Sequence, residues 1–300
     1  MELLSALPGA VAQGLVWGIM AIGVYITFRI LDIADLTVDG SICTGAAVCT
    51  MLMINGVPVW LAVLAATAAG LLAGALTGAL HIFLGIPAIL SGILTQLVLW
   101  SVNLKIMGKA NQPLSARSYK VLISQMNVHS AIAILAVCSV LLVAVLYLFF
   151  GTELGASIRA TGINAAMSRA QGINTDVTKL LGLSLSNGLV AFSGALLCQY
   201  QGYADINMGK GAVVIGLAAV VIGEAVISKL PTNFAIRLSG VILGAVIYYI
   251  VYQVIIFVGL DPDLLKMFSA IVVAVFLGTP YLKRKLASHR GIQKEGKVNA

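Results

Sequence analysis

Long apolar runs with almost no charge constrain this chain more than any other feature of its sequence. Residues 57–80 and 131–150 are two such runs. Each approaches the length of about 20 residues that a helix needs to cross about 30 Å of hydrocarbon. Only 10% of the residues are charged, 60% are hydrophobic, and the mean hydropathy is +1.03. These values exclude an ordinary soluble domain and predict an all-α, polytopic transmembrane helix bundle.

We expect about 8–10 membrane segments, including broken or re-entrant helices. The predicted helices span residues 8–30, 40–54, 57–80, 89–107, 131–150, 179–200, 213–229, 234–258 and 264–282. The segment 40–54 is short for a crossing, and 213–229 contains Glu224 and ends in Lys229. A broken helix is tolerated in a membrane only where protein surrounds it. Residues 1–282 therefore form one predicted transmembrane domain, and residues 283–300 form a basic tail.

The distribution of positive charge predicts the orientation. The net charge is +7, and six of the 18 Lys and Arg residues fall in the last eighteen positions. The positive-inside tendency places such a tail in the cytoplasm, and a basic tail explains the charge better than nucleic-acid binding does. Nine crossings then place the N-terminus outside, on a first helix that we expect to be retained. The segment 108–130, with Lys109, Arg117 and Lys120, would face outward against the tendency.

Motifs for catalysis or metal binding are absent from the sequence. There is no phosphate-binding loop and no H-E-x-x-H pattern, and the three histidines are far apart. Gly209-Lys210-Gly211 lacks both the upstream glycine and the following Ser or Thr of a phosphate loop. The four cysteines lie in apolar runs, where a thiol usually packs as a small residue. We expect no catalytic residue, no metal and no bound cofactor, and an intramembrane enzyme is a remote alternative.

Polar side chains inside apolar spans are costly in lipid, so they are expected to face protein or water. The predicted substrate pathway consists of Asp39, Gln96, Asn103, Asn187, Gln199 and Glu224. Hydrogen bonds between helices are the alternative for each amide, and Glu224 fits either reading. Glycines also recur at four-residue spacing, at Gly70, Gly74 and Gly78, at Gly14 and Gly18, and at Gly240 and Gly244. This spacing favours close helix packing within one bundle over a dedicated dimer face.

The segment 151–178 is too polar to cross a membrane and too regular for a linker. Residues 163–171 predict a short helix between Gly162 and Gly172, with Met167 on an apolar side beside polar Asn164 and Arg169. Such a helix can occupy a groove on another protein. The alternative is a solvated loop that contains an incidental helix.

The same segment carries a family resemblance. Arg159-Ala160-x-Gly162-x-Asn164, Gly172-Ile173, Lys179-Leu180-Leu181 and residues 218–223 resemble bacterial ABC transporter permeases that serve branched-chain amino acids, ribose and related solutes. Residues 34–41 and 86–89 extend the resemblance in the family's order. Glu224 replaces a usual glycine and Asp39 interrupts the sugar-type motif, which is more similar to the tryptophan/tyrosine-type branch.

The resemblance implies a function and a set of partners. It implies an importer subunit in the bacterial cytoplasmic membrane that moves an aromatic or branched-chain amino acid. The implied partners are a second permease copy, an extracellular solute-binding protein, membrane lipid, and a cytoplasmic ATPase that holds ATP and Mg. The implied ATPase-coupling residues are Arg159, Gly162, Asn164, Ala165, Met167, Arg169 and Gly172. The alternatives are an ABC permease for a sugar or nucleoside and an ion-coupled secondary carrier, which would transport without an ATPase.

Overall fold

The computed structural model describes residues 2–115, 119–228 and 233–257, with a few single positions between 267 and 278. Its helices are α1 (Glu2–Tyr25), α2 (Val38–Ile54), α3 (Val59–Phe83), α4 (Ala88–Met107), α5 (Val128–Gly151), α6 (Glu153–Ile163), α7 (Ala165–Ala170), α8 (Thr175–Gln201), α9 (Ala212–Ile227) and α10 (Phe234–Phe257). A π-helical turn, η1 (Ile26–Ile30), extends α1, and a 3-10 turn, η2 (Gln125–Asn127), precedes α5. Strands β1 (Asn111–Pro113) and β2 (Tyr203–Asp205) pair antiparallel. The predicted all-α class is confirmed.

The helix lengths are those of a multi-pass membrane protein. Within the described residues, six helices are long and apolar enough to span a membrane, and α2 and α9 are shorter apolar helices of 17 and 16 residues. Eight of the predicted segments therefore form helices close to their expected bounds. The predicted helix 264–282 lies mostly outside the described residues, and the tail 283–300 lies wholly outside them. The domain boundary between them stays a prediction.

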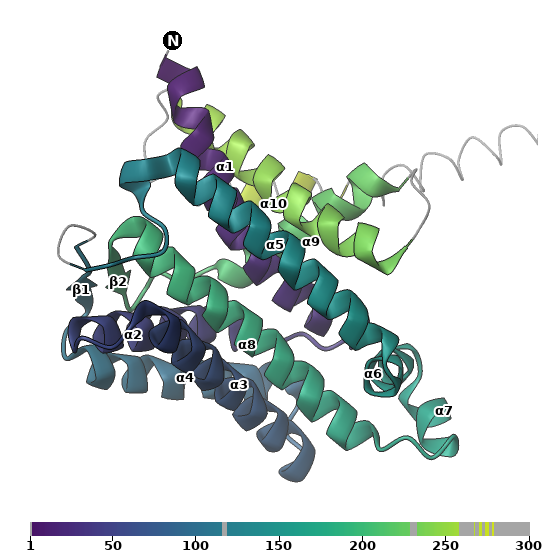
Figure 1. Cartoon of the computed structure of the whole chain (residues 1–300). Helices are drawn as coiled ribbons and strands as arrows, with labels where there is room; N and C mark the ends of the chain where they lie inside the picture. The colour runs from purple at the N-terminus through teal and green to yellow at the C-terminus, as the bar shows by residue number, and fades with distance from the viewer. Residues whose placement is uncertain are drawn as a thin grey trace, which may run out of the picture.

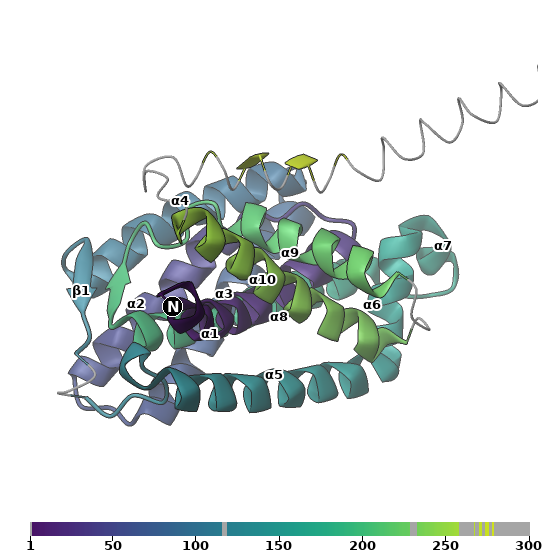
Figure 2. The same ribbon diagram turned by 90° about the horizontal axis from the view of Figure 1, so that it is seen from above.

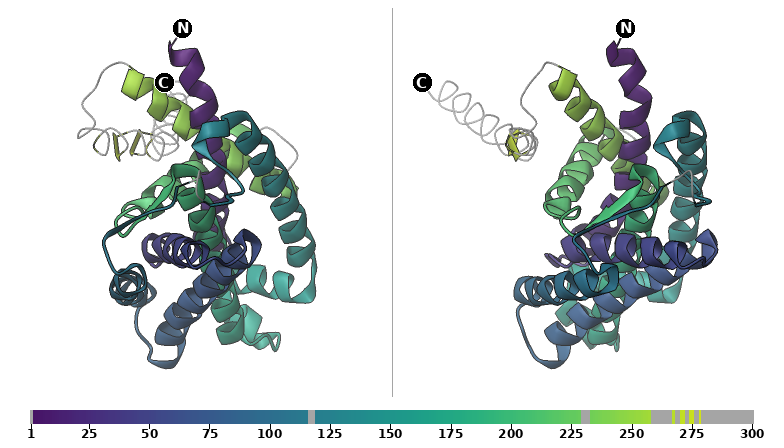
Figure 3. Two further views of the ribbon diagram at one scale, coloured as in Figure 1. Left: turned by 60° about the vertical axis from the view of Figure 1, so that its left-hand side comes forward. Right: turned by 90° about the vertical axis from the view of Figure 1, so that its left-hand side faces the viewer.

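Two long helices, α1 and α8, form the centre of the bundle. The spans of α1 and α8 are 83% and 67% buried, against 22% for α5. α1, in the N-terminal half of the chain, packs on the short helix α9 and the long helix α10 of the C-terminal half. In the same way, α8 packs on the short helix α2 and the long helix α3 of the N-terminal half. Figure 3 shows α2, α3 and α4 gathered on one side of the molecule and α1, α9 and α10 on the other. α5 lies at the edge of the bundle (Figure 2).

The spaced glycines pack these helices together, as predicted. A Cβ on Gly74 would overlap the backbone carbonyl of Leu183 in α8, and one on Gly14 would lie 2.7 Å from Val246 Cα in α10. Gly244 faces the backbone of α9 in the same way. Absence of a side chain lets each backbone approach its neighbour within the bundle.

Both short helices begin inside the bundle. Ser41, in the first turn of α2, donates a 2.6 Å hydrogen bond to Asn187, near the middle of α8. Gly216, near the start of α9, packs against Val24 of α1. The two N-termini also meet, because Asp39 of α2 accepts hydrogen bonds from Gly211 and Val213. Broken or re-entrant helices were expected in these two segments, and their short length and interior starts fit that expectation.

The two ends of α8 distinguish the two ends of the bundle. α6 and α7 precede its first residue, whereas β2 follows its last residue and pairs with β1 (Figure 1). The described parts of the 108–130 segment thus lie at the opposite end from 151–178, which is the relative placement predicted for these two segments. In either orientation, one of these two basic segments faces outward.

Candidate functional site

A cavity of about 260 Å³ lies where α2, α4 and the 206–211 loop meet. Three of the predicted pathway residues line it together. Its polar and aromatic lining comprises Asp39, Cys43, Gln96, Trp100, Asn103 and Lys210. The cavity joins groups from three separate parts of the sequence at the meeting point of the two short helices.

Asp39 connects the two short helices through its carboxylate. It lies in the first turn of α2, and its Oδ2 and Oδ1 accept hydrogen bonds from Gly211 N at 2.9 Å and Val213 N at 3.0 Å. Gly211 precedes α9 with a φ of +87°, a conformation that glycine adopts without strain. The N-terminus of a helix carries a partial positive charge that favours an anion. Asp39 is therefore held by its own helix and by the start of α9.

The 206–211 loop packs directly on the first turns of α2. Cys43 Sγ accepts a hydrogen bond from Gly209 N at 3.2 Å and donates one to the Ile206 carbonyl at 3.4 Å. A Cβ on Gly209 would overlap the Asp39 carbonyl oxygen. This close contact places the exposed Lys210 on the cavity wall, opposite in charge to Asp39.

Helix α4 supplies two amides to the cavity. Asn103 is fully buried, and its side-chain nitrogen and oxygen have no hydrogen-bond partner among the described residues. An unsatisfied buried amide is destabilising by about 1–3 kcal/mol. Gln96 lies two turns earlier, where Gly40 of α2 approaches its backbone. Asn103 is therefore available to a polar solute or to water in the cavity.

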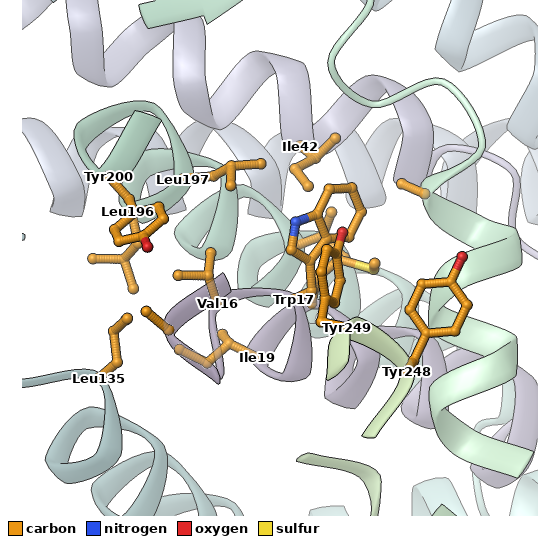
Figure 4. Packing of buried hydrophobic residues seen from close by; sticks show 14 of the residues in the cluster. Val16, Trp17, Ile19, Ile42, Leu135, Leu196, Leu197, Tyr200, Tyr248 and Tyr249 are labelled. Carbon is orange, nitrogen blue, oxygen red and sulfur yellow. The ribbon is translucent and has the colours of Figure 1, made fainter. Parts of the chain in front are cut away.

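A second cavity, of about 360 Å³, is lined by the same loop and shares Lys210 with the first. Four aromatic side chains line it: Trp17 of α1 with Tyr248, Tyr249 and Tyr252 of α10. Ring centroids are 5.8 Å apart for Trp17 and Tyr249 and 5.9 Å apart for Tyr249 and Tyr252. Figure 4 shows Trp17 beside Tyr249 within the apolar core. An aromatic ring can stack in such surroundings.

The other three predicted pathway residues lie elsewhere. Asn187 donates to Asp35 Oδ2 at 2.7 Å and accepts from Ser41, which joins α8 to the start of α2. Gln199 accepts from the backbone nitrogen of Leu122 at 2.9 Å. These contacts match the alternative of hydrogen bonds between segments.

Glu224 lies in the last turns of α9, toward the α6–α7 end. Its Oε1 is 2.7 Å from Arg29 Nε of η1. The two side chains are 35% and 56% exposed, respectively. The structure does not bring Glu224 to either cavity.

The predicted short helix at 163–171 forms as α7, from Ala165 to Ala170. Asn164 caps it, because its Oδ1 accepts a 3.0 Å hydrogen bond from Met167 N. Gly172 follows the helix with a φ of +81°. Met167 is 63% exposed, and Arg169 is also exposed. These residues present a short, capped helix at one end of the bundle.

The preceding helix, α6, was not predicted, and it holds α7 against the bundle. A Cβ on Gly162 would overlap the carbonyl oxygen of Ile30 in η1. Arg159 donates to the Phe150 carbonyl at 2.9 Å and lies 5.8 Å from the ring centroid of Phe234. Gly162 and Arg159 thus face the bundle, in contrast to the exposed α7. Residues 31–38 connect Ile30, which Gly162 contacts, to Asp39 of the solute cavity.

Lys210, Trp100 and Cys43 were not among the predicted site residues. The pattern that marks Lys210 is the glycine on each side of it, which permits the close contact with α2. Trp100 and Cys43 carry no such mark, because both are ordinary residues of an apolar helix.

Comparison with known proteins gives consistent matches along most of the chain. Residues 7–278 match the family described as "Branched-chain amino acid transport system / permease component". The chain is 38% identical over 283 residues to the tyrosine transport system permease protein of Clostridioides difficile, covering 94% of each. It is 33% identical over 273 residues to an uncharacterised protein of Rickettsia prowazekii, covering 90% of this chain and 96% of that one. The fructose import permease protein of Bifidobacterium longum is 29% identical over 245 residues, which cover 80% of this chain and 68% of that one. No solved structure gives a significant match.

Proposed function

This chain belongs to the family of permease components of branched-chain amino acid transport systems, and from that premise we propose that it is the membrane-spanning subunit of an importer for an amino acid. The subunit works with a second copy of itself in the bacterial cytoplasmic membrane. An extracellular binding protein delivers the solute, and a separate cytoplasmic ATPase binds ATP and Mg. The C-terminus and α6–α7 face the cytoplasm. The chain moves solute and performs no reaction of its own.

We infer the class of solute from the two opposite charges, Asp39 and Lys210, that line the first cavity. Asp39 suits the ammonium group of an amino acid, and Lys210 suits its carboxylate. The neighbouring cavity, with Trp17 and Tyr249 in its wall, suits an aromatic or branched apolar side chain. The similarity to a tyrosine permease supports the same class.

A sugar is the second candidate, because a fructose permease is also similar to this chain. The amides of Gln96 and Asn103 suit hydroxyl groups. A sugar needs many hydrogen-bond partners, however, and the second cavity is lined by one tryptophan, three tyrosines and several apolar residues. We therefore favour an aromatic amino acid.

Coupling to ATP follows from the packing of α6. Closure of the ATPase subunits displaces α7, and the contact of Gly162 with Ile30 transmits the displacement to residues 31–37. Those residues lead to Asp39, which connects α2 to α9. The two short helices then exchange access between the two sides of the membrane as a two-state element.

Uptake by the reconstituted complex tests this function. Vesicles containing the chain, its ATPase and its binding protein are loaded with ATP and given labelled tyrosine in the presence of unlabelled competitors. Tryptophan should compete strongly, leucine more weakly and fructose not at all. Uptake of labelled fructose in the same vesicles, with no uptake of labelled tyrosine, would establish the sugar alternative. Uptake by the chain without an ATPase would establish an ion-coupled carrier.

Replacing Lys210 with glutamine is expected to raise the KM for tyrosine uptake about tenfold, because one charge-assisted contact worth about 1.5 kcal/mol is lost. The maximal uptake rate should change little. Lys105→Gln is the matched control, because Lys105 is an exposed lysine of α4 that lines neither cavity. Equal KM values for the two variants would exclude Lys210 from the pathway.

A further inference from the structure

Three arginines line a separate cavity of about 420 Å³ at the α6–α7 end of the bundle. Arg29 comes from η1, Arg159 from α6 and Arg237 from α10, so three elements meet there. Tyr25 and Phe234 supply aromatic walls. This cavity contains none of the residues assigned to the solute pathway.

The cavity carries more positive charge than its described lining residues neutralise. Arg29 has a carboxylate partner, Glu224, and theirs is the sole salt bridge within the described residues. Arg159 donates to a backbone carbonyl and lies against an aromatic ring, and Arg237 lines the cavity together with Tyr25. No carboxylate is among the described residues that line the cavity. Two guanidinium groups therefore face it without a counter-charge, which favours an anionic occupant.

The position of the cavity relative to the membrane indicates what kind of anion reaches it. Arg29 lies in the last turn of the membrane span Ala6–Ile30, and Arg237 lies in the first turn of the span Phe234–Phe257. Side chains at the ends of spans lie at the level of the lipid headgroups. The nearby surface is also apolar, with Phe28 40% exposed and Val226 51% exposed. An occupant with an anionic head and an apolar tail fits both properties.

We propose that this three-arginine cavity binds the phosphate of an anionic phospholipid from the leaflet on the α6–α7 side. Planar guanidinium groups bind phosphate oxygens in pairs, and basic pockets between membrane helices accept anionic headgroups in this way. The bound phosphate joins η1, α6 and α10, so the lipid stabilises the position of the coupling segment. The proposal depends on neither the transported solute nor the partner ATPase.

Lipid retention by the purified full-length chain tests the proposal. The protein is titrated with phosphatidylglycerol or phosphatidylcholine in mild detergent, and bound lipid is measured by native mass spectrometry. We expect a clear preference for phosphatidylglycerol. Arg237→Gln should weaken that binding about fivefold, as expected for one cation near a lipid phosphate. Arg237→Lys keeps the charge and should lose less, whereas Lys179→Gln removes a charge at the same end outside the cavity and should bind as wild type.

Three outcomes would overturn the proposal. Arg237→Gln and Lys179→Gln could retain phosphatidylglycerol equally. Inorganic phosphate could displace the lipid, which would assign the cavity to a free anion. Arg237→Gln could leave lipid binding intact and reduce copurification of the ATPase, which would make the cavity a protein interface. Thermal unfolding of each variant in detergent confirms that the proteins compared are folded.

Discussion

Replacing Asp39 with alanine is expected to abolish ATP-driven uptake and to lower the free energy of unfolding by about 2–4 kcal/mol. Alanine removes both hydrogen bonds to the start of α9, at 2.9 and 3.0 Å, together with the anion that its N-terminus favours. It also removes the negative charge of the solute cavity. Uptake in reconstituted vesicles and thermal unfolding in detergent measure the two effects separately.

Two further variants define the role of Asp39. Asp39→Asn keeps the size and one oxygen acceptor but loses the charge, so it should retain more stability than alanine while still transporting poorly. Asp176→Ala is the control, because Asp176 is an exposed acid in the first turn of α8. Normal uptake by Asp39→Ala would contradict the account, whatever its stability.

Replacing Gly162 with alanine is expected to reduce uptake more than tenfold through the addition of a single methyl group. The new Cβ would overlap the carbonyl oxygen of Ile30, so α6 must shift away from η1 at a cost of about 1–3 kcal/mol. ATP hydrolysis by the assembled complex should continue, because α7 itself is unchanged. The ratio of solute moved to ATP hydrolysed measures this uncoupling.

Gly151→Ala provides a matched control in the same segment. It is the same substitution at the end of α5, where a Cβ would meet nothing within 4 Å. Wild-type coupling in Gly151→Ala and loss of coupling in Gly162→Ala would support transmission through η1. Equal coupling in the two variants would show that the movement takes another route.

Much of the fold could be predicted because hydrocarbon imposes its length on the helices. The apolar runs give the described helices close to their observed bounds, and Gly162 and Gly172 correctly bracket α7. α6 was missed because its buried positions are Gly155, Ile158 and Thr161. Small and polar residues on the buried face hide the apolar periodicity that marks a helix.

The partner of a polar group could not be predicted in the same way. Polarity within an apolar span requires that an atom find a partner, but the sequence does not say which one. Asp39, Gln96 and Asn103 meet in one cavity, whereas Asn187 connects two helices and Glu224 binds Arg29. Lys210 joins Asp39 only through tertiary packing, over a separation of more than 170 residues.

The sequence also could not predict that helices of one half of the chain pack on helices of the other half. Gly74 and Gly14 predict close helix contacts, yet a glycine carries no information about which helix approaches it. The packing of α8 on α3 and of α1 on α10 is known only from the structure.

Copurification with an ATPase tests the central claim most directly. The tagged chain is isolated from its native membrane in mild detergent, and its partners are identified by mass spectrometry. The control carries Arg169→Glu with Asn164→Ala, which reverses an exposed charge on α7 and removes its cap. The account predicts that an ATPase subunit copurifies with the wild-type chain and is lost from the control. Isolation of the wild-type chain alone, with uptake persisting in vesicles that lack ATP, would contradict it.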